Sequence, residues 1–300
     1  MLFSRSTVDV LRTKSPARKS APRRHRTLRF ESLERRELLT ATVNDFAGLK
    51  AAIELGQDSD IELGSDIVID STYADATITL STGTFNINGH GNKITVGTNV
   101  TRGASLFTVS NGSLTLSNLT ISGFNYVGGY GGVFQQTGGT ITIDSGTTIT
   151  NCGAYNGAVA DIDRGTFIVS GATFSGNTAA NNGGVVDLEM GTLIINSGTF
   201  SNNTANTAAG SGGVVSADTQ FAEVAINNGL FTGNSAYIGG VAYVNSGKIS
   251  IADGTFSGNS ASFEGGVIAT TTQFSEVTIE DGDFMTLLGP SGCGKTTTLR

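Results

Sequence analysis

The residues best suited to chemistry lie near the end of the sequence, where Gly289-Pro-Ser-Gly-Cys-Gly-Lys295-Thr296 fits the spacing G-x-x-x-x-G-K-[ST]. Glycines at this spacing let backbone N–H groups surround phosphate oxygens, while the lysine reaches the β and γ oxygens and the next hydroxyl holds Mg²⁺. The spacing therefore predicts a nucleotide-binding loop for ATP, in which Thr296 would also hold Mg²⁺. The predicted binding residues are Gly289, Gly292, Gly294, Lys295, Thr296 and Thr297.

A second group of residues that could take part in catalysis is acidic. Asp161, Asp163 and Arg164 fall in one short segment, and Asp187 and Glu189 follow one repeat later near the same phase. Two carboxylates about 5–10 Å apart can cleave a glycoside, whereas a lyase needs an acidic metal site with a basic residue beside it. A solvated polar side of a strand explains the same pattern, and we favour that interpretation over a catalytic site.

Histidine and cysteine offer little further chemistry, since the sequence holds two of each. His90 lies in a Gly-His-Gly segment without a companion Asp-Asp or Arg-x-Lys, so we expect it in a turn. Cys152 and Cys293 lie in unlike contexts and suggest no disulfide framework.

The elements that must position these residues follow a repeat of about 26 residues. A Gly-Gly-Val-like step recurs six times, and the intervals between its valines are 26, 26, 29, 27 and 26 residues. A Phe-x-x-Asn step runs in phase with it. Such self-similarity indicates stacked units that cannot bury their apolar faces alone. The valines are Val133, Val159, Val185, Val214, Val241 and Val267, and the second step is Phe174 with Asn177, Phe200 with Asn203, Phe231 with Asn234, and Phe256 with Asn259.

Each repeat also holds short alternations of apolar and polar residues between Gly and Asn, such as Thr140–Ile143 and Thr166–Val169. Three short strands in about 26 residues suit one coil of a parallel β-helix, in which like residues stack about 4.8 Å apart. The sequence therefore predicts an all-β protein, a right-handed parallel β-helix (solenoid) of about nine coils over residues 43–284. We expect the valines and phenylalanines to form columns, and the asparagines a ladder of side-chain amides at a turn.

The two ends of the chain differ from this body. Residues 44–55 predict a short capping helix that covers the first open edge, with Asn44 as its N-cap, one apolar stripe, and Gly56 in a left-handed conformation after it. Residues 1–42 hold 11 of the 18 basic residues and have a net charge of +7, which predicts a disordered basic segment. Residues 43–300 have a net charge of −14, so we expect no nucleic-acid partner. No apolar run approaches the ~18–20 residues of a transmembrane segment.

The phased motifs resemble known families. Over about residues 120–284 the pairing of GG[VAI] with FxxN resembles polymorphic outer-membrane proteins, which are bacterial adhesin and autotransporter passengers with a β-helix fold. Ile87–Ile94 looks like the first coils of pectate-lyase-like β-helices. Phe30–Ala41 resembles the Leu-Glu-x-Arg-x-Leu-Leu export segment of bacterial surface proteins, although it lacks an apolar h-region. These resemblances imply an exported, extracellular or cell-surface protein with a structural or adhesive role and a glycan or cell-surface partner. The matching export residues are Leu33, Glu34, Arg36, Leu38 and Leu39.

The last segment, Thr278–Arg300, closely resembles ABC importer ATPases of the spermidine, sugar and ferric-iron type. That resemblance implies a cytoplasmic ATP-binding subunit of a transporter. The sequence holds no Q-loop, Leu-Ser-Gly-Gly-Gln signature, Walker B carboxylate or switch histidine after it, so we expect residues 285–300 to be a truncated Walker A fragment. The repeat also places Phe284 in the phenylalanine column and leaves Leu287 where asparagine is expected.

Three functions are open at this point. The first is an exported or cell-surface β-helix protein with a structural or adhesive role, no catalysis and no cofactor, which binds through its lateral faces or through the loops 196–213 and 215–223. The second is an ATP-binding subunit of an ABC transporter, which would take ATP and Mg²⁺ only if other sequence completed the loop. The third is a polysaccharide lyase or hydrolase that uses Asp161 or Asp163. The sequence does not predict the oligomeric state.

Overall fold

The computed structural model describes residues 40–56, 59–206, 208–272, 275–279 and 286–288. These residues form one α-helix, one short 3₁₀ helix and 31 short strands. The predicted basic segment and its export motif, up to residue 39, lie outside the described residues. The predicted nucleotide-binding residues from Gly289 to Thr297 lie outside them as well, so both remain predictions.

The strands form three sheets of parallel strands, here named A, B and C. Sheet A consists of β1 (Ala41–Val43), β2 (Ser59–Leu63), β3 (Ile67–Ile69), β5 (Thr84–Asn88), β6 (Lys93–Val96), β8 (Ser113–Ser117), β9 (Thr120–Ser122), β12 (Thr140–Asp144), β13 (Thr148–Thr150), β16 (Thr166–Ser175), β19 (Thr192–Ser201), β22 (Glu223–Ile226), β23 (Leu230–Thr232), β26 (Lys248–Ile251), β27 (Thr255–Ser257), β30 (Glu276–Ile279) and β31 (Thr286–Leu288). Sheet B consists of β4 (Ile78–Leu80), β7 (Phe107–Val109), β11 (Phe134–Gln136), β15 (Ala160–Ile162), β18 (Val186–Leu188), β21 (Val215–Ala217), β25 (Ala242–Val244) and β29 (Ile268–Thr270). Sheet C consists of β10 (Asn125–Tyr130), β14 (Gly153–Asn156), β17 (Thr178–Ala179), β20 (Thr204–Ala205), β24 (Ser235–Ile238) and β28 (Ser260–Glu264).

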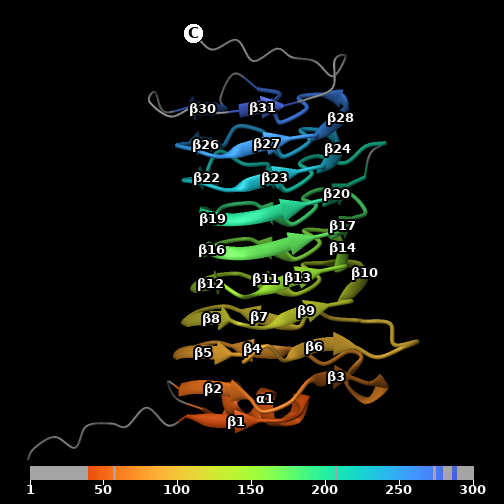
Figure 1. Ribbon diagram of the computed structural model, residues 1–300, viewed down its shortest axis with the longest axis vertical. Helices are drawn as coiled ribbons and strands as arrows, with labels where there is room; N and C mark the ends of the chain where they lie inside the picture. The colour runs from red at the N-terminus through yellow and green to blue at the C-terminus, as the bar shows by residue number, and fades with distance from the viewer. Residues whose placement is uncertain (1–39, 57–58, 207, 273–274, 280–285, 289–300) are drawn as a thin grey trace, which may run out of the picture. The chain divides into compact units, whose positions relative to one another are not determined.

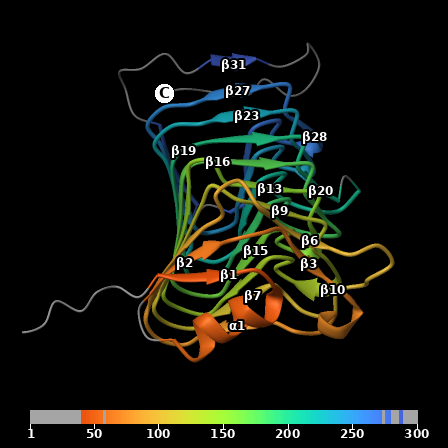
Figure 2. The same ribbon diagram turned by 60° about the horizontal axis from the view of Figure 1, so that its bottom comes forward.

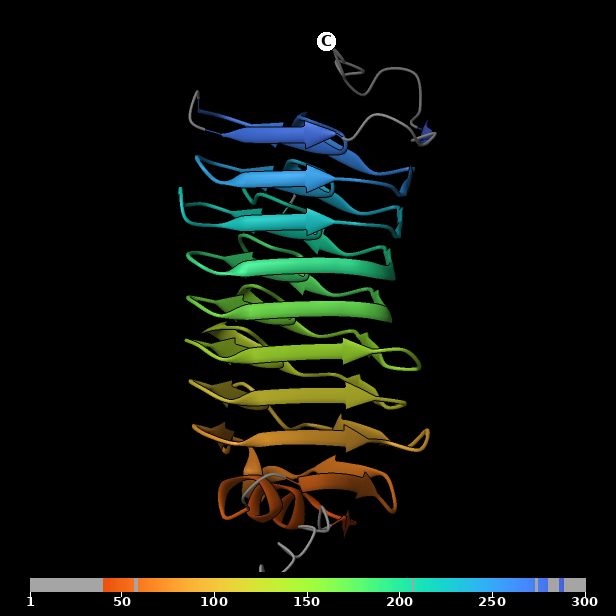
Figure 3. The same cartoon turned by 90° about the vertical axis from the view of Figure 1, so that its left-hand side faces the viewer.

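The chain visits these sheets in a fixed order and so builds a stack of coils (Figure 1). One circuit runs through β16, β17 and β18, and the next runs through β19, β20 and β21, directly beside it. About eight such coils lie between β2 and β29, slightly fewer than predicted. The strands that face the viewer in Figure 3 point to the right as the chain climbs from N- to C-terminal coils, which makes the coil right-handed. The predicted parallel β-helix is therefore confirmed.

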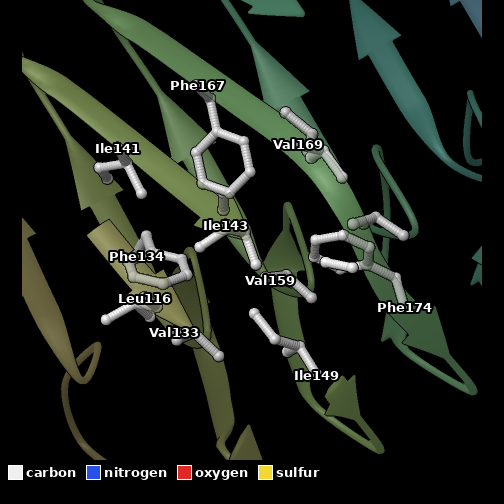
Figure 4. Close-up of a cluster of buried hydrophobic side chains, with 14 of the residues drawn as sticks. Leu116, Val133, Phe134, Ile141, Ile143, Ile149, Val159, Phe167, Val169 and Phe174 are labelled. Atoms are coloured by element: carbon white, nitrogen blue, oxygen red, sulfur yellow. The ribbon is translucent and has the colours of Figure 1, made fainter. Parts of the chain in front are cut away.

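One continuous apolar cluster fills the inside of the coils. In β12, Ile141 and Ile143 are fully buried while the residues beside them are half-buried. Figure 4 shows these two isoleucines pointing into the same interior as Phe167 and Val169 of the next coil. Alternate residues of a strand point to opposite faces, so a period of two in the sequence is enough to select the side chains of the core.

The valine and phenylalanine columns are present as predicted. The N–H of Val159 donates to the carbonyl of Val185 at 2.9 Å, and the same bond links each valine of the column to the next. The rings of Phe174, Phe200, Phe231 and Phe256 stack in order, with centroids 5.0, 4.9 and 4.7 Å apart and interplanar angles of 4–6°. Each repeat thus finds its apolar partner at the same position of its neighbour, which sets the register of the coils.

The asparagine column forms a ladder of buried side-chain amides. The Nδ2 atoms of Asn177, Asn203 and Asn234 donate to the Oδ1 of the next asparagine at 3.0, 3.0 and 2.9 Å. Each Nδ2 also donates to a backbone carbonyl of the preceding coil, as Asn203 does to Phe174 at 3.0 Å. The residue before each ladder position has a left-handed backbone, with φ between 53° and 66°, and is Asn or Gly because these residues adopt that conformation most readily. Those residues are Asn151, Gly176, Asn202, Gly233 and Gly258.

A helix covers the N-terminal coil, in a position that Figure 2 shows beside β1. This helix, α1 (Phe46–Glu54), packs against β1 to β4 with Phe46, Leu49 and Ile53 buried, as predicted. Its N-cap is Asp45, whose side chain accepts a hydrogen bond from the N–H of Gly48 at 2.7 Å, so the prediction of Asn44 is wrong by one residue. Gly56 is not left-handed either. Its lack of a side chain matters for another reason, because a Cβ there would lie 2.1 Å from the carbonyl of Ala52.

The last described coil departs from the repeat by three residues. Val277 lies opposite Ile249, as the repeat predicts, but Leu287 lies opposite Phe256. The connection from Ile279 to Thr286 is three residues longer than the matching connection one coil earlier. The prediction that Leu287 stands in the asparagine column is therefore wrong, because an insertion shifts it to the phenylalanine position; Phe284 lies outside the described residues.

Candidate functional site

The structure brings together the acidic residues that the sequence nominated. Asp161 of β15 and Asp187 of β18 are register neighbours on adjacent coils of sheet B. Both point away from the apolar interior, since the residues on either side of them fill the core. Their side chains are nevertheless only 8% and 4% exposed, so the prediction of a solvated polar side is wrong for these two positions.

The acidic set is larger than the sequence indicated. Asp218, in the connection after β21, also lies close enough to raise the pKa of Asp187. Asp163, Glu189 and Asp218 each follow the valine of their own repeat by four residues. This common spacing could have identified Asp218 from the sequence. We call these five residues the acidic cluster: Asp161, Asp163, Asp187, Glu189 and Asp218.

The turn between sheets C and B lies beside this cluster. Gly183 at this turn has φ +65°, and a Cβ there would lie 2.3 Å from the carbonyl of Val186 at the start of β18. The turn also supplies amides: Asn156 donates to Asp187, and Asn182 Nδ2 donates to Asp218 Oδ2 at 3.3 Å. Asp187 Oδ1 is buried without a hydrogen-bond partner. The close turn at Gly183 therefore places amide groups against Asp187 and Asp218, whereas Glu189 is exposed.

Burial changes the protonation of the cluster. It raises the pKa of Asp161 to about 7, with Asp163 and Glu189 adding a smaller repulsion. It raises the pKa of Asp187 well above its usual range, followed by repulsion from Asp218, Asp161 and Glu189. Burial also raises the pKa of Asp218. Asp161, Asp187 and Asp218 therefore retain protons at a pH where an ordinary exposed carboxyl group has lost its proton.

The geometry offers the carboxyl groups of Asp161 and Asp187 little access to a substrate. A glycosidase needs an acid that reaches the scissile oxygen and a second carboxylate across a cleft, whereas Asp161 and Asp187 are almost completely covered. Arg164 is exposed, and within the described residues no ion pair joins it to the acids. In the same part of the chain, no group of three or more His, Cys, Asp or Glu side chains is arranged to hold a metal ion.

The other nominated residues serve the fold. His90 lies in the turn after β5 with φ 51°, as predicted, and its Nε2 is 3.7 Å from Glu62 Oε1. Cys152 occupies the ladder position one coil before Asn177, and its N–H donates to Asn177 Oδ1 at 3.0 Å. Burial raises the pKa of the Cys152 thiol to about 12, so the thiolate that reactive cysteines require does not form near neutral pH.

A dependence of stability on pH follows from the acidic cluster. Asp161 binds a proton below about pH 7 in the folded chain but only below about pH 3.8 when unfolded. The free energy of unfolding should therefore fall as the pH rises from 4 through 7. Asp161→Asn should weaken this fall and raise the Tm at pH 8 by about 2–4 °C, as measured by thermal melts at pH 5 and pH 8. Glu264→Gln, at an exposed acid of β28 outside the acidic cluster, is the matched control. A wild-type Tm that rises from pH 5 to pH 8 would contradict this account.

Comparisons with known proteins agree with the fold and with the motifs. No helix in the described part of the chain has the length and apolarity needed to cross a bilayer. No curated protein and no solved structure matches the chain. Two family matches are found, and neither includes the segments predicted for nucleotide binding or most of the export motif. Residues 40–155 are similar to a putative pectate lyase-like adhesive domain, and residues 171–188, which contain one Phe-x-x-Asn and one Gly-Gly-Val step, are similar to the Chlamydia polymorphic membrane protein repeat.

Proposed function

We propose that this chain is an adhesive module of a bacterial cell surface that binds its partner through the lateral faces of the stacked coils. The observation that carries the proposal is the match of residues 40–155 to an adhesive domain, on a chain whose coils continue in the same register beyond that range. The repeated valines and phenylalanines fill the interior, and the repeated asparagines form the buried ladder. The partner is therefore recognised by the outward side chains, whose identity the repeat does not fix.

The buried acids favour adhesion over glycan cleavage. A glycosidase needs two carboxyl groups that reach the substrate, whereas Glu189 is the one exposed member of the acidic cluster and Asp161 and Asp187 are almost completely buried. A stack of coils held by continuous ladders instead presents a long surface with fixed spacing, which suits attachment to an extended partner.

The proposal predicts where the protein is found. Antibodies against an outward segment such as β10 should label intact cells that make the full chain, while antibodies against a cytosolic marker should label only permeabilised cells. Deletion of the gene should reduce attachment of these cells to surfaces or to other cells, and re-expression of the full chain should restore it. A protein that is labelled only after permeabilisation, with unchanged attachment after deletion, would overturn the proposal.

A further inference from the structure

One lateral face of the stack differs in character from the rest of an acidic chain. The six strands of sheet C climb one side of the coils in Figure 1. Their sequences hold Tyr, Asn, Ser, Thr, Gly and Ala together with Val127, Ile238 and Phe263, and Glu264 is the single charged residue among them. Residues 43–300 have a net charge of −14, so this face is a neutral strip on an anionic body.

Aromatic rings stand at two levels of this strip, in one column. Ala154, Ala179, Ala205 and Ala236 are buried neighbours on successive coils, which places the next residue of each strand on the outside. At that position Tyr155 and Tyr237 lie three coils apart, about 14 Å along the stack. A second ring supports each of them. Tyr130 lies edge-on to Tyr155 with centroids 6.2 Å apart, and Phe263 stacks on Tyr237 at 5.2 Å.

Three of these four rings are open to solvent, and Tyr237 is half-buried. Tyr130 and Tyr155 are 46% and 44% exposed, and Phe263 is 66% exposed. Apolar side chains gathered on one exposed face commonly mark an interaction site. Tyrosine suits such a site because it combines a rigid ring with a polar tip at a low cost in conformational entropy.

The coils between the two aromatic levels carry small and polar side chains. Ala180 and Asn206 are the exposed residues that follow Ala179 and Ala205 on the two coils between Tyr155 and Tyr237. Asn206 Nδ2 donates to the Ala180 carbonyl at 3.0 Å, and the N–H of Tyr237 donates to the carbonyl of Gly210 at 2.9 Å. A row of hydroxyl groups runs beside the column, two residues earlier in each strand, and two of them, Thr204 and Ser235, are hydrogen-bonded at 3.1 Å. The row consists of Thr178, Thr204, Ser235 and Ser260, which are register neighbours.

We infer that sheet C is a docking surface for an uncharged glycan that lies along the coil axis, an inference that rests on the adhesive function proposed above. Sugar rings offer C–H faces that stack on tyrosine and phenylalanine, and hydroxyl groups that pair with serine and threonine. The aromatic pairs and the hydroxyl row that runs beside them offer both kinds of contact in one direction. A polyanionic glycan does not fit, because the acidic body repels it and the strip offers no cation.

The test measures binding of the full chain to an array of immobilised neutral and acidic glycans. We expect wild type to bind neutral glycans, and Tyr155→Ala together with Tyr237→Ala to weaken that binding by about 100-fold, or about tenfold for each ring. Tyr155→Phe with Tyr237→Phe should retain most of the binding, since the rings remain. Phe221→Ala, which removes an exposed ring outside sheet C, is the matched control and should bind as wild type does.

The outcomes separate this inference from the function on which it rests. If cells with the wild-type chain attach through it but the tyrosine-to-alanine variant attaches equally well, adhesion stands and the sheet C site is wrong. Binding to acidic glycans alone, or to a protein partner with no effect of the two tyrosines, would also overturn the site. If the wild-type chain supports no attachment at all, the adhesive function itself fails. A thermal melt of each variant excludes unfolding as the cause of a loss.

Discussion

Asn203→Ala should lower the free energy of unfolding by about 3–5 kcal/mol, because it leaves several buried polar groups without partners. The Oδ1 atom of Asn203 accepts from both the N–H and the Nδ2 of Asn177, at 3.1 and 3.0 Å. Its Nδ2 donates to the Phe174 carbonyl and to Asn234 Oδ1. Alanine removes all four bonds, and water cannot replace them at positions that are fully buried. Urea unfolding followed by circular dichroism would measure the loss.

The chain offers a matched control for this substitution. Asn196 and Asn227 also form an amide pair across adjacent coils, with Nδ2 of Asn227 donating to Oδ1 of Asn196 at 2.9 Å, but both side chains are exposed. Asn196→Ala should therefore cost less than about 0.5 kcal/mol, since water takes over its hydrogen bonds. If Asn203→Ala and Asn196→Ala lowered the free energy of unfolding equally, the buried amides would not be what holds the coils together.

Gly183→Ala should destabilise the chain by about 3 kcal/mol or more, for two reasons that add up. Its φ of +65° costs a residue with a side chain about 1–2 kcal/mol. A Cβ would also lie 2.3 Å from the carbonyl of Val186, and backbone at that point cannot withdraw without moving β18. Thermal unfolding of the variant, compared with that of wild type, checks the loss.

A second glycine separates backbone strain from the steric clash. Gly258 has almost the same φ, +63°, but a Cβ there would meet its nearest neighbour only at 3.9 Å. Gly258→Asn should cost less than about 1 kcal/mol, because Asn202 already occupies the equivalent left-handed position two coils earlier. If Gly183→Ala were as mild as Gly258→Asn, the close approach at the turn would be irrelevant to stability.

The fold could be predicted from the sequence wherever one residue type recurs at one phase. The Val, Phe and Asn columns follow from spacing alone, because like residues of a parallel stack must meet their counterparts. The same logic failed at Leu287, where an insertion of three residues is invisible until the register of β31 is known. The N-cap was misplaced by one residue because Asn44 and Asp45 are both suitable capping residues and only the local geometry distinguishes them.

The sites were harder to predict than the fold. The burial of Asp161 and Asp187 depends on the packing around their strands, and the outward phase of an acidic residue does not reveal that packing in the sequence. The aromatic strip was missed for a different reason. Tyr155 and Tyr237 lie 82 residues apart in the sequence and share a column only because three coils of unequal length separate them. Sequence motifs mark what each coil has in common, whereas the strip is formed by residues at which the coils differ.

The central claim is that each repeat is an interchangeable coil whose columns join its neighbours, and deletion of one coil tests it most directly. Removal of residues 178–203 joins Asn177 to Thr204, and Thr178 and Thr204 are register neighbours, so the ladder, the phenylalanine column and the three sheets should re-form. We expect this variant to unfold cooperatively, with a Tm within a few degrees of wild type, whereas deletion of residues 178–190, half a coil, should abolish cooperative unfolding. If the whole-coil deletion were as disruptive as the half-coil deletion, the stacked-column account would be contradicted.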